Sequence, residues 1–215
     1  MHYNCAVITP PDDEPEIVAD HVTRLMSPYQ GFHNGAGWWD WYQIGGRWAG
    51  SLISEQGIRG DRSLVDDRPD EEVYTTSRHC DAAPIDSIDW DAVGADQVKS
   101  LTRLYHSDPI RDLPPNSIDR SMPLAQFLRE RMEPWLTWRW LNHDGTTESQ
   151  KEVYDLWRDE FDKVIRDPDR SVYQRWYRDK QPEVAEHRRV FARDLQKLLG
   201  EAPDGYWLTI VDYHS

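Results

Sequence analysis

The pattern of apolar and polar positions predicts short strands near both ends of the chain. Segment 2–9 is rich in small and β-branched apolar residues and stops at Pro10 and Pro11, which is typical of a strand. Segment 206–215 alternates aromatic or β-branched residues with polar ones and predicts another strand. We expect these two terminal strands to be neighbours in one sheet.

Apolar residues recur at helical spacing in five further segments, which cover residues 15–26, 91–105, 123–133, 147–167 and 182–199. Thr147 and Gln150 form a capping-box signature at the start of the fourth segment. Pro182 stands in the first turn of the fifth. Segment 135–141 fits either a strand or a helix.

A third strand region lies where aromatic residues flank two glycines. Residues 38–44 and 47–54 predict two strands joined by a Gly45–Gly46 turn, because both positions of a tight hairpin turn can require positive φ. A single bulged strand that bends at the glycines is the competing interpretation. Segment 55–91, with eleven Asp or Glu and four Arg, predicts an irregular acidic surface excursion, with a short strand near residues 73–75.

These elements together predict an α+β fold in a single domain over residues 1–215. We expect a small, mainly antiparallel sheet with a ferredoxin-like arrangement, covered by helices on one face. The helices between about residues 92 and 200 form an extension of this domain.

Composition limits the classes of partner. The formal net charge of −14 argues against general binding to nucleic acid or anionic membranes. The sequence has no apolar run of membrane-spanning length and no signal-peptide pattern, so we expect a cytoplasmic protein. The 11 Trp and 10 Tyr predict an aromatic core. Cys5 is expected to be a buried, inert residue, with a nucleophilic role beside His2 or His214 as the alternative.

Gly45, Gly46 and Arg47 form the first candidate binding site. A Gly turn can present successive backbone N–H groups to an anion, and Arg adds a planar donor pair for phosphate or carboxylate. Trp41 and Trp48 flank this turn and could stack on a base. The structural alternative is a tight hairpin in which Arg47 pairs with Asp40 and the Trp side chains fill the core.

Asp212 and His214 form the second candidate site, because residues two apart on a strand point to the same face. If the terminal strands pair antiparallel, His2 joins them. Such a set could act as a general acid or base, or hold Zn²⁺, Mn²⁺ or Fe²⁺. A weaker candidate is Asp81, Asp86 and Asp89, which could bind Mg²⁺ or Ca²⁺ but fit turn formation and helix capping better.

Four segments resemble an uncharacterised protein family found mainly in bacteriophages and some bacteria. Its members carry a Trp-Asp-Trp-Tyr-x-Ile/Val-Gly-Gly-Arg-Trp-x-Gly segment, which residues 39–50 match closely, and residues 1–8, 80–90 and 211–214 match its opening, acidic and closing motifs. The family's closing Cys is Tyr213 in this chain, so a role for that thiol does not carry over. The resemblance implies a phage origin, and hence the cytoplasm of a bacterial host, but no reaction.

Two functional hypotheses remain open. The first is a phage-type accessory protein that binds a phosphate-bearing small molecule or nucleotide through the Gly-Gly-Arg-Trp segment, with or without hydrolysis and with or without a divalent metal. The second is a non-catalytic acidic protein that binds a host protein or mimics nucleic acid through residues 61–91.

Overall fold

The computed structural model describes residues 2–12, 14–31, 37–62, 64, 67–106, 123–131, 137–150, 163–164, 166 and 170–215. The helices are α1 (Pro15–Met26), α2 (Asp70–Val73), α3 (Trp90–His106), α4 (Leu124–Arg131) and α6 (Arg170–Glu201), with 3₁₀ turns η1 (Ser27–Tyr29), η2 (Gly46–Trp48) and η3 (Ile85–Ser87). The strands are β1 (His2–Thr9), β2 (Trp41–Ile44), β3 (Leu52–Ile53), β4 (His79–Cys80), β5 (Ala82–Pro84), β6 (Arg139–Leu141), β7 (Thr147–Ser149) and β8 (Trp207–His214). The mixture confirms the predicted α+β class.

The chain divides into two compact units. The first comprises Met1–Val93, Leu136–Ser149 and Lys197–Ser215, and the second comprises Gly94–Trp135 and Gln150–Gln196. All described strands belong to the first unit, whereas the second contains α4 and most of α3 and α6. None of the helices in the described part of the chain combines the length and apolar composition of a membrane span.

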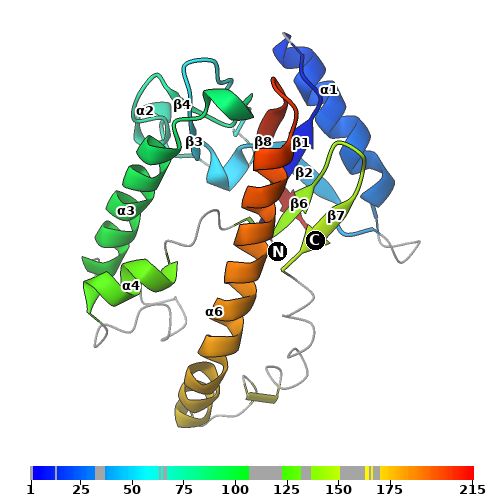
Figure 1. Ribbon diagram of the computed structural model, residues 1–215. Coiled ribbons are helices and arrows are strands. Elements are labelled where there is room, and N and C mark those ends of the chain that lie inside the picture. Colours follow the sequence, from blue (N-terminus) through cyan, green and yellow to red (C-terminus); the bar gives the residue numbers. More distant parts are fainter. Residues whose placement is uncertain are drawn as a thin grey trace. The chain divides into compact units, whose positions relative to one another are not determined.

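The main sheet is built around the two terminal strands, which lie side by side in Figure 1. Its order is β2-β8-β1-β6-β7, and β5 pairs with another part of β8. Eight residue pairs join β1 to β8 antiparallel, from His2–His214 to Thr9–Trp207. Among the described strand pairs of this sheet, only β1–β6 is parallel. The predictions of neighbouring terminal strands and a mainly antiparallel sheet are therefore confirmed.

The ferredoxin-like strand order is not reproduced. In that arrangement the second strand of the central hairpin lies beside the first strand of the fold. Here the first strand of the β6–β7 hairpin occupies that place, parallel to β1, and β7 lies outside it. The edge next to β8 is extended by β2 and β5, which a four-stranded ferredoxin-like sheet does not have.

The hairpin predicted around Gly45–Gly46 is wrong. β2 pairs with β8, and β3 pairs with β4 in a separate two-stranded sheet. Gly45 and Gly46 do have positive φ angles of 74° and 55°, but they lead into η2 instead of a returning strand. The amide of Gly45 still donates to Ile210 O of β8 at 2.8 Å, and the chain turns into η2 at the next residue.

Other local predictions also change. The strand expected at residues 73–75 is wrong, because Val73 ends helix α2. Thr147 begins strand β7 and caps no helix, whereas most of residues 151–167 lie outside the described residues. Segment 135–141 contributes strand β6. Helix α6 begins at Arg170, so Pro182 stands inside it, where the flanking Glu, Gln, Lys and Ala residues favour helix on both sides.

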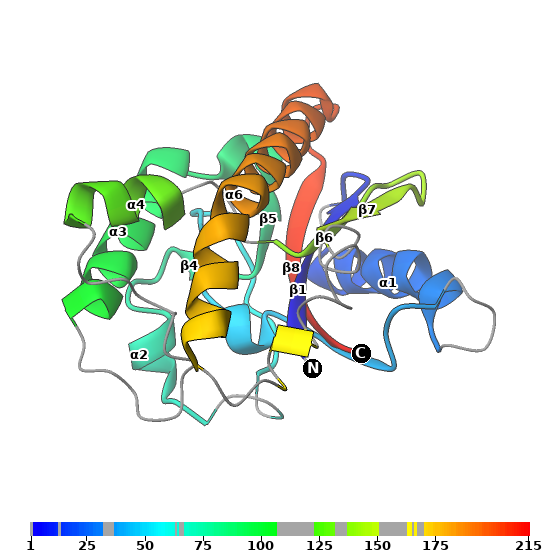
Figure 2. The same ribbon diagram turned by 90° about the horizontal axis from the view of Figure 1, so that it is seen from below.

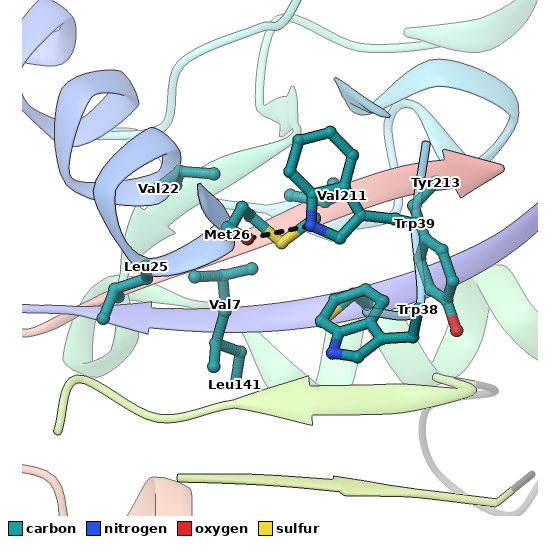
Figure 3. Packing of buried hydrophobic residues seen from close by; sticks show 10 residues of the cluster. Val7, Val22, Leu25, Met26, Trp38, Trp39, Leu141, Val211 and Tyr213 are labelled. Carbon is teal, nitrogen blue, oxygen red and sulfur yellow. Dashed lines mark hydrogen bonds between the residues drawn. The ribbon is translucent and has the colours of Figure 1, made fainter. Parts of the chain in front are cut away.

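Helix α1 covers one face of the sheet, as Figure 2 shows. Val22 and Met26 of α1 pack with Val7 and Val211 of the central strands and with both Trp residues that precede β2 (Figure 3). The indole of one of these, Trp39, donates to the main-chain oxygen of Met26 at 2.8 Å, so its polar atom is satisfied inside the core. The two Trp residues that precede β2 and Tyr213 of β8 are the buried aromatic residues of this core cluster.

Candidate functional site

The predicted site residues of the terminal strands lie on the sheet face opposite the α1 core. Side chains alternate along β8, so Val211 and Tyr213 face the core while Asp212 and His214 face the other way. His214 lies directly opposite His2 on β1 and Trp41 on β2. Pairing of β8 with both neighbours therefore brings three predicted residues into one row.

The aromatic rings of this row are in contact. The imidazoles of His2 and His214 have ring centres 5.3 Å apart in an edge-to-face arrangement. The ring centre of His2 lies 5.9 Å from that of Trp41, again edge-on. Because each ring contacts its neighbour, the three side chains form one continuous surface at the paired strand ends.

Asp212 is the buried anchor of this row. Its side chain has no exposed surface, whereas that of His2 is 21% exposed. His2 Nδ1 lies 3.0 Å from Asp212 Oδ1, and the backbone amide of Arg47 donates to Asp212 Oδ2 at 3.1 Å. A buried carboxylate is unfavourable unless it accepts hydrogen bonds. The imidazole and the amide meet this requirement, and they fix the ring of His2.

His214 has a carboxylate of its own, Asp40. Its Nδ1 lies 2.9 Å from Asp40 Oδ1, with side chains 41% and 50% exposed. The hydrogen bond from His214 holds the pKa of the Asp40 carboxyl below its usual range. Pairing of Asp40 with Arg47 was the structural alternative from the sequence, and the geometry assigns Asp40 to His214 instead.

The two His–Asp pairs have the same chemical form. Each imidazole interacts with its carboxylate through Nδ1, and no hydrogen bond to Nε2 of either ring comes from the described residues. A carboxylate on Nδ1 fixes the orientation and tautomer of a histidine and leaves Nε2 for proton transfer. The arrangement therefore provides two oriented imidazoles within reach of one small ligand.

Arg47 contributes its backbone to the fold and its side chain to the surface. The Arg47 amide is engaged by Asp212, and the Gly45 amide by Ile210 O, so two of the donors expected to bind a ligand anion already have acceptors. The guanidinium is exposed, and among the described residues no acceptor or acid pairs with it. Anion binding at this turn therefore depends mainly on the Arg47 side chain and not on these two amides.

The glycines of the turn are needed for close packing against buried carboxylates. A Cβ on Gly46 would lie 2.4 Å from Asp212 Cβ, and one on Gly45 would lie 2.6 Å from Asp81 Cγ. Trp41 and Trp48 are half-buried, so each keeps some exposed surface for a ligand. Trp38, in contrast, is buried in the core.

Asp81 is a second buried carboxylate and belongs to the structural framework. It accepts hydrogen bonds at 2.6 Å from the amides of Gly50 and Gly60 and from the hydroxyl of Tyr74. Burial raises the pKa of Asp81, and these hydrogen bonds oppose the increase. The sequence did not reveal this role, because the three glycines and the tyrosine that surround Asp81 are scattered along the chain and meet only in the folded structure.

The metal hypotheses gain no support from the geometry. Among the described residues, no group of three or more His, Cys, Asp or Glu side chains is placed to hold a metal ion. His2 and His214 turn their Nδ1 atoms to different carboxylates. Asp89 caps α3 by accepting from the Ala92 amide at 3.0 Å, as the capping interpretation predicted, while Asp81 is buried elsewhere.

Cys5 lies on the core face of β1, away from the two histidines. It is completely buried, and burial raises the pKa of its thiol to about 12. A thiol with such a pKa is not ionised at neutral pH. The prediction of a buried residue is confirmed, and the nucleophilic alternative does not fit this position.

Fold and site together define an α+β protein with two carboxylate-oriented histidines at the paired ends of its sheet. Comparisons with family models, with curated proteins and with solved structures find no match. The resemblance to the phage-associated family therefore stays a prediction, and the functional argument rests on the chemistry of the site.

Proposed function

We propose that the site at the paired ends of β1, β2 and β8 binds a phosphate-bearing small molecule, such as a nucleotide, and hydrolyses a phosphoester bond in it. One observation carries the proposal. His2 and His214 are each oriented through Nδ1 by a carboxylate, and their ring centres are 5.3 Å apart. Two such imidazoles suit a reaction that needs both a proton acceptor and a proton donor.

Binding in this proposal depends on Arg47 and the nearby aromatic rings. The exposed guanidinium follows directly after Gly46, and its own amide bonds the carboxylate that holds His2. Arg binds phosphate oxygens in a bidentate, charge-assisted manner. Trp41 contacts His2 and keeps exposed surface, so it provides a face on which a base can stack.

The reaction needs one neutral and one protonated imidazole. Nε2 of the neutral ring removes a proton from water, whose oxygen forms the new bond to phosphorus. As the old P–O bond breaks, Nε2 of the protonated ring gives its proton to the leaving oxygen. Asp212 and Asp40 keep their partners oriented, and Arg47 offsets the negative charge on the phosphoryl oxygens. One water is consumed, and the two rings exchange protonation states.

The biological setting of this proposal comes from the sequence resemblance alone. A phage accessory protein that sequesters or hydrolyses a host nucleotide would alter a host signal. That setting predicts activity on nucleotides that occur in bacteria, and the reaction itself does not depend on it.

The alternative function uses the acidic surface of residues 61–91. Seven of the nine acidic residues that the structure describes in this segment have exposed side chains. The three that follow Pro69 in helix α2, Asp70, Glu71 and Glu72, are all exposed. Such a surface suits a basic protein partner. This binding role involves no catalysis, and the proposed phosphoester hydrolysis does not use the acidic surface.

A ligand screen tests the proposal. Nucleotides, dinucleotides and simple phosphate esters would be scored by thermal shift and by phosphate or product release, with wild type, Arg47→Ala, His2→Ala and His214→Ala. We expect weaker binding for Arg47→Ala and a loss of turnover of about 10²-fold or more for either histidine variant. Arg24→Ala, which removes an exposed arginine of α1, is the matched control.

Two results would contradict the proposal. If no phosphate compound shifts or is turned over by the wild type, the acidic-surface function becomes the better explanation. If turnover occurs but both histidine variants retain it, the chemistry lies elsewhere in the molecule.

A further inference from the structure

The opposite face of the same sheet contains a buried cation that the proposed reaction does not use. Arg139 lies on β6 directly beside Cys5 of β1, hence on the core face, and only 9% of its surface is exposed. Its guanidinium carbon is 4.3 Å from the ring centre of Trp38, which is a cation–π contact. Trp38 in turn meets Tyr213, and both side chains are drawn in Figure 3. Their rings are edge-to-face, with ring centres 4.7 Å apart.

Two N–H donors in this cluster are buried without an acceptor. Arg139 Nη1 donates to Thr147 Oγ1 at 3.2 Å, but Arg139 Nε has no hydrogen-bond partner among the described residues. The same holds for the indole Nε1 of Trp38. Buried polar atoms are nearly always hydrogen-bonded in folded proteins. These two unsatisfied donors lie on side chains that touch each other, so both are available to one acceptor.

The charge of Arg139 supports the same conclusion. A guanidinium stays protonated in proteins, and buried charges are normally paired. Within the described part of the chain, no carboxylate forms an ion pair with Arg139. The nearby acids do not supply a negative charge, because burial raises the pKa of both the Cys5 thiol and the Tyr213 hydroxyl. The charge of Arg139 and its hydrogen bond to the Tyr213 hydroxyl oppose this increase only in part.

We propose that Arg139 and Trp38 form a second binding site, which takes one small oxyanion: a carboxylate or phosphate group. Arg139 Nε and Trp38 Nε1 are the donors, and Tyr213 forms part of the aromatic wall. The site is separate from the histidine site, because Tyr213 and Asp212 point to opposite faces of β8. Its occupancy is therefore independent of any phosphoester hydrolysis.

The indole N–H resonances of ¹⁵N-labelled protein provide a direct test. Inorganic phosphate and acetate would each be titrated against chloride at constant ionic strength, with the Trp38 resonance assigned from Trp38→Phe. We expect this resonance to move along a saturable one-site curve in the wild type and to stay fixed in Arg139→Met. Arg139→Lys keeps the charge but not the planar donor group, so we expect roughly tenfold weaker binding.

Arg59→Met is the matched control. The Arg59 guanidinium also lies over an aromatic ring, 4.4 Å from the centre of Tyr74, but its Nε and Nη2 already donate to the main-chain oxygens of His79 and Thr76. This substitution should leave the Trp38 titration unchanged. Substitution of His2 should also leave it unchanged, which separates this proposal from the hydrolytic one.

The inference is overturned if neither anion moves the Trp38 resonance of the wild type, or if Arg139→Met responds like the wild type. It is also overturned if Arg139→Met is destabilised equally in phosphate and in chloride, since that result would mean that Arg139 contributes no stability that depends on the anion. If Arg139→Met fails to fold, the titration of Arg139→Lys decides the question.

Discussion

Gly46 lies so close to Asp212 that a Cβ on this glycine would be 2.4 Å from the Cβ of the aspartate. The φ angle of Gly46 is also positive, at 55°, a conformation that costs other residues about 1–2 kcal/mol. We therefore expect Gly46→Ala to lower the free energy of unfolding by about 2–4 kcal/mol, through backbone strain and overpacking together. Urea denaturation measures this loss.

Gly94→Ala is the control for that substitution. Gly94 lies inside α3, and a Cβ there would meet no atom within 4 Å. The change should be neutral or raise the free energy of unfolding by about 0.4–1 kcal/mol, because it restricts the unfolded chain. Equal effects of the two substitutions would mean that Gly46 is not held against Asp212.

Tyr74→Phe tests the buried carboxylate of Asp81. The substitution removes one of the three hydrogen bonds at 2.6 Å that stabilise this carboxylate. We expect a loss of about 1.5–3 kcal/mol, the range for hydrogen bonds to charged groups, measured by chemical denaturation.

Tyr42→Phe is the matched change at an exposed hydrogen bond, where the Tyr42 hydroxyl lies 2.8 Å from Thr23 Oγ1. This substitution should stay within about 0.5 kcal/mol of the wild type. If Tyr74→Phe lowers the free energy of unfolding as little as Tyr42→Phe does, the hydrogen bond from Tyr74 does not stabilise the Asp81 carboxylate.

The carboxyl carbon of Asp40 should titrate at a lower pH than an ordinary aspartate. The hydrogen bond from His214 lowers the pKa of Asp40 in the folded protein. A lowered pKa means that the pair stabilises the fold above the ordinary aspartate pKa of about 3.9, and that this contribution disappears as the pH falls through the folded pKa.

NMR titration of the Asp40 carboxyl carbon, in wild type and in His214→Ala, gives the two midpoints. We expect the wild-type midpoint to be lower and the midpoint of the variant to return toward the ordinary value. Identical midpoints would show that the His214–Asp40 pair does not form in solution.

Both thiols should resist modification in the folded protein. Cys5 and Cys80 are buried, and burial raises the pKa of each thiol to about 12. A thiol reagent at pH 8 should therefore label neither residue on the time scale of free cysteine, and should label both after denaturation. Rapid labelling of one thiol in the native state would indicate that its strand opens locally.

Sequence reasoning predicted the two terminal strands and their position as neighbours in one sheet. The hypothesis that His2 meets Asp212 and His214 required these strands to pair antiparallel. The structure brings these three residues together. Local patterns were sufficient here because alternation along a strand decides which side chains share a face.

The Gly45–Gly46 turn could not be assigned correctly from local pattern alone. Two glycines between aromatic segments favour a hairpin, but β2 pairs with β8, which lies far away in sequence. Asp40 was missed as the partner of His214 for the same reason, because it lies just outside β2 and meets His214 only through that pairing. The residues next to a strand in the sequence do not show which distant strand it pairs with.

One available signal was overlooked. Asp144-Gly145 lies between β6 and β7, and Gly145 has a φ angle of 85°. An Asp-Gly dipeptide flanked by strand-forming residues is a strong hairpin signal, which competes with the capping box at Thr147. Arg139 was also unforeseen, because burial of an arginine in an aromatic core goes against the usual distribution of charged residues.

The pairing of β1 with β8 also affects how the protein can be synthesised and folded. His2 and Asp212 are 210 positions apart, so β1 leaves the ribosome long before its antiparallel partner β8 has been made. Such long loop closure slows folding, and it leaves β1 unpaired on its β8 side during translation. The histidine site is therefore expected to be among the last features to form, and an incomplete chain that lacks β8 would have no such site.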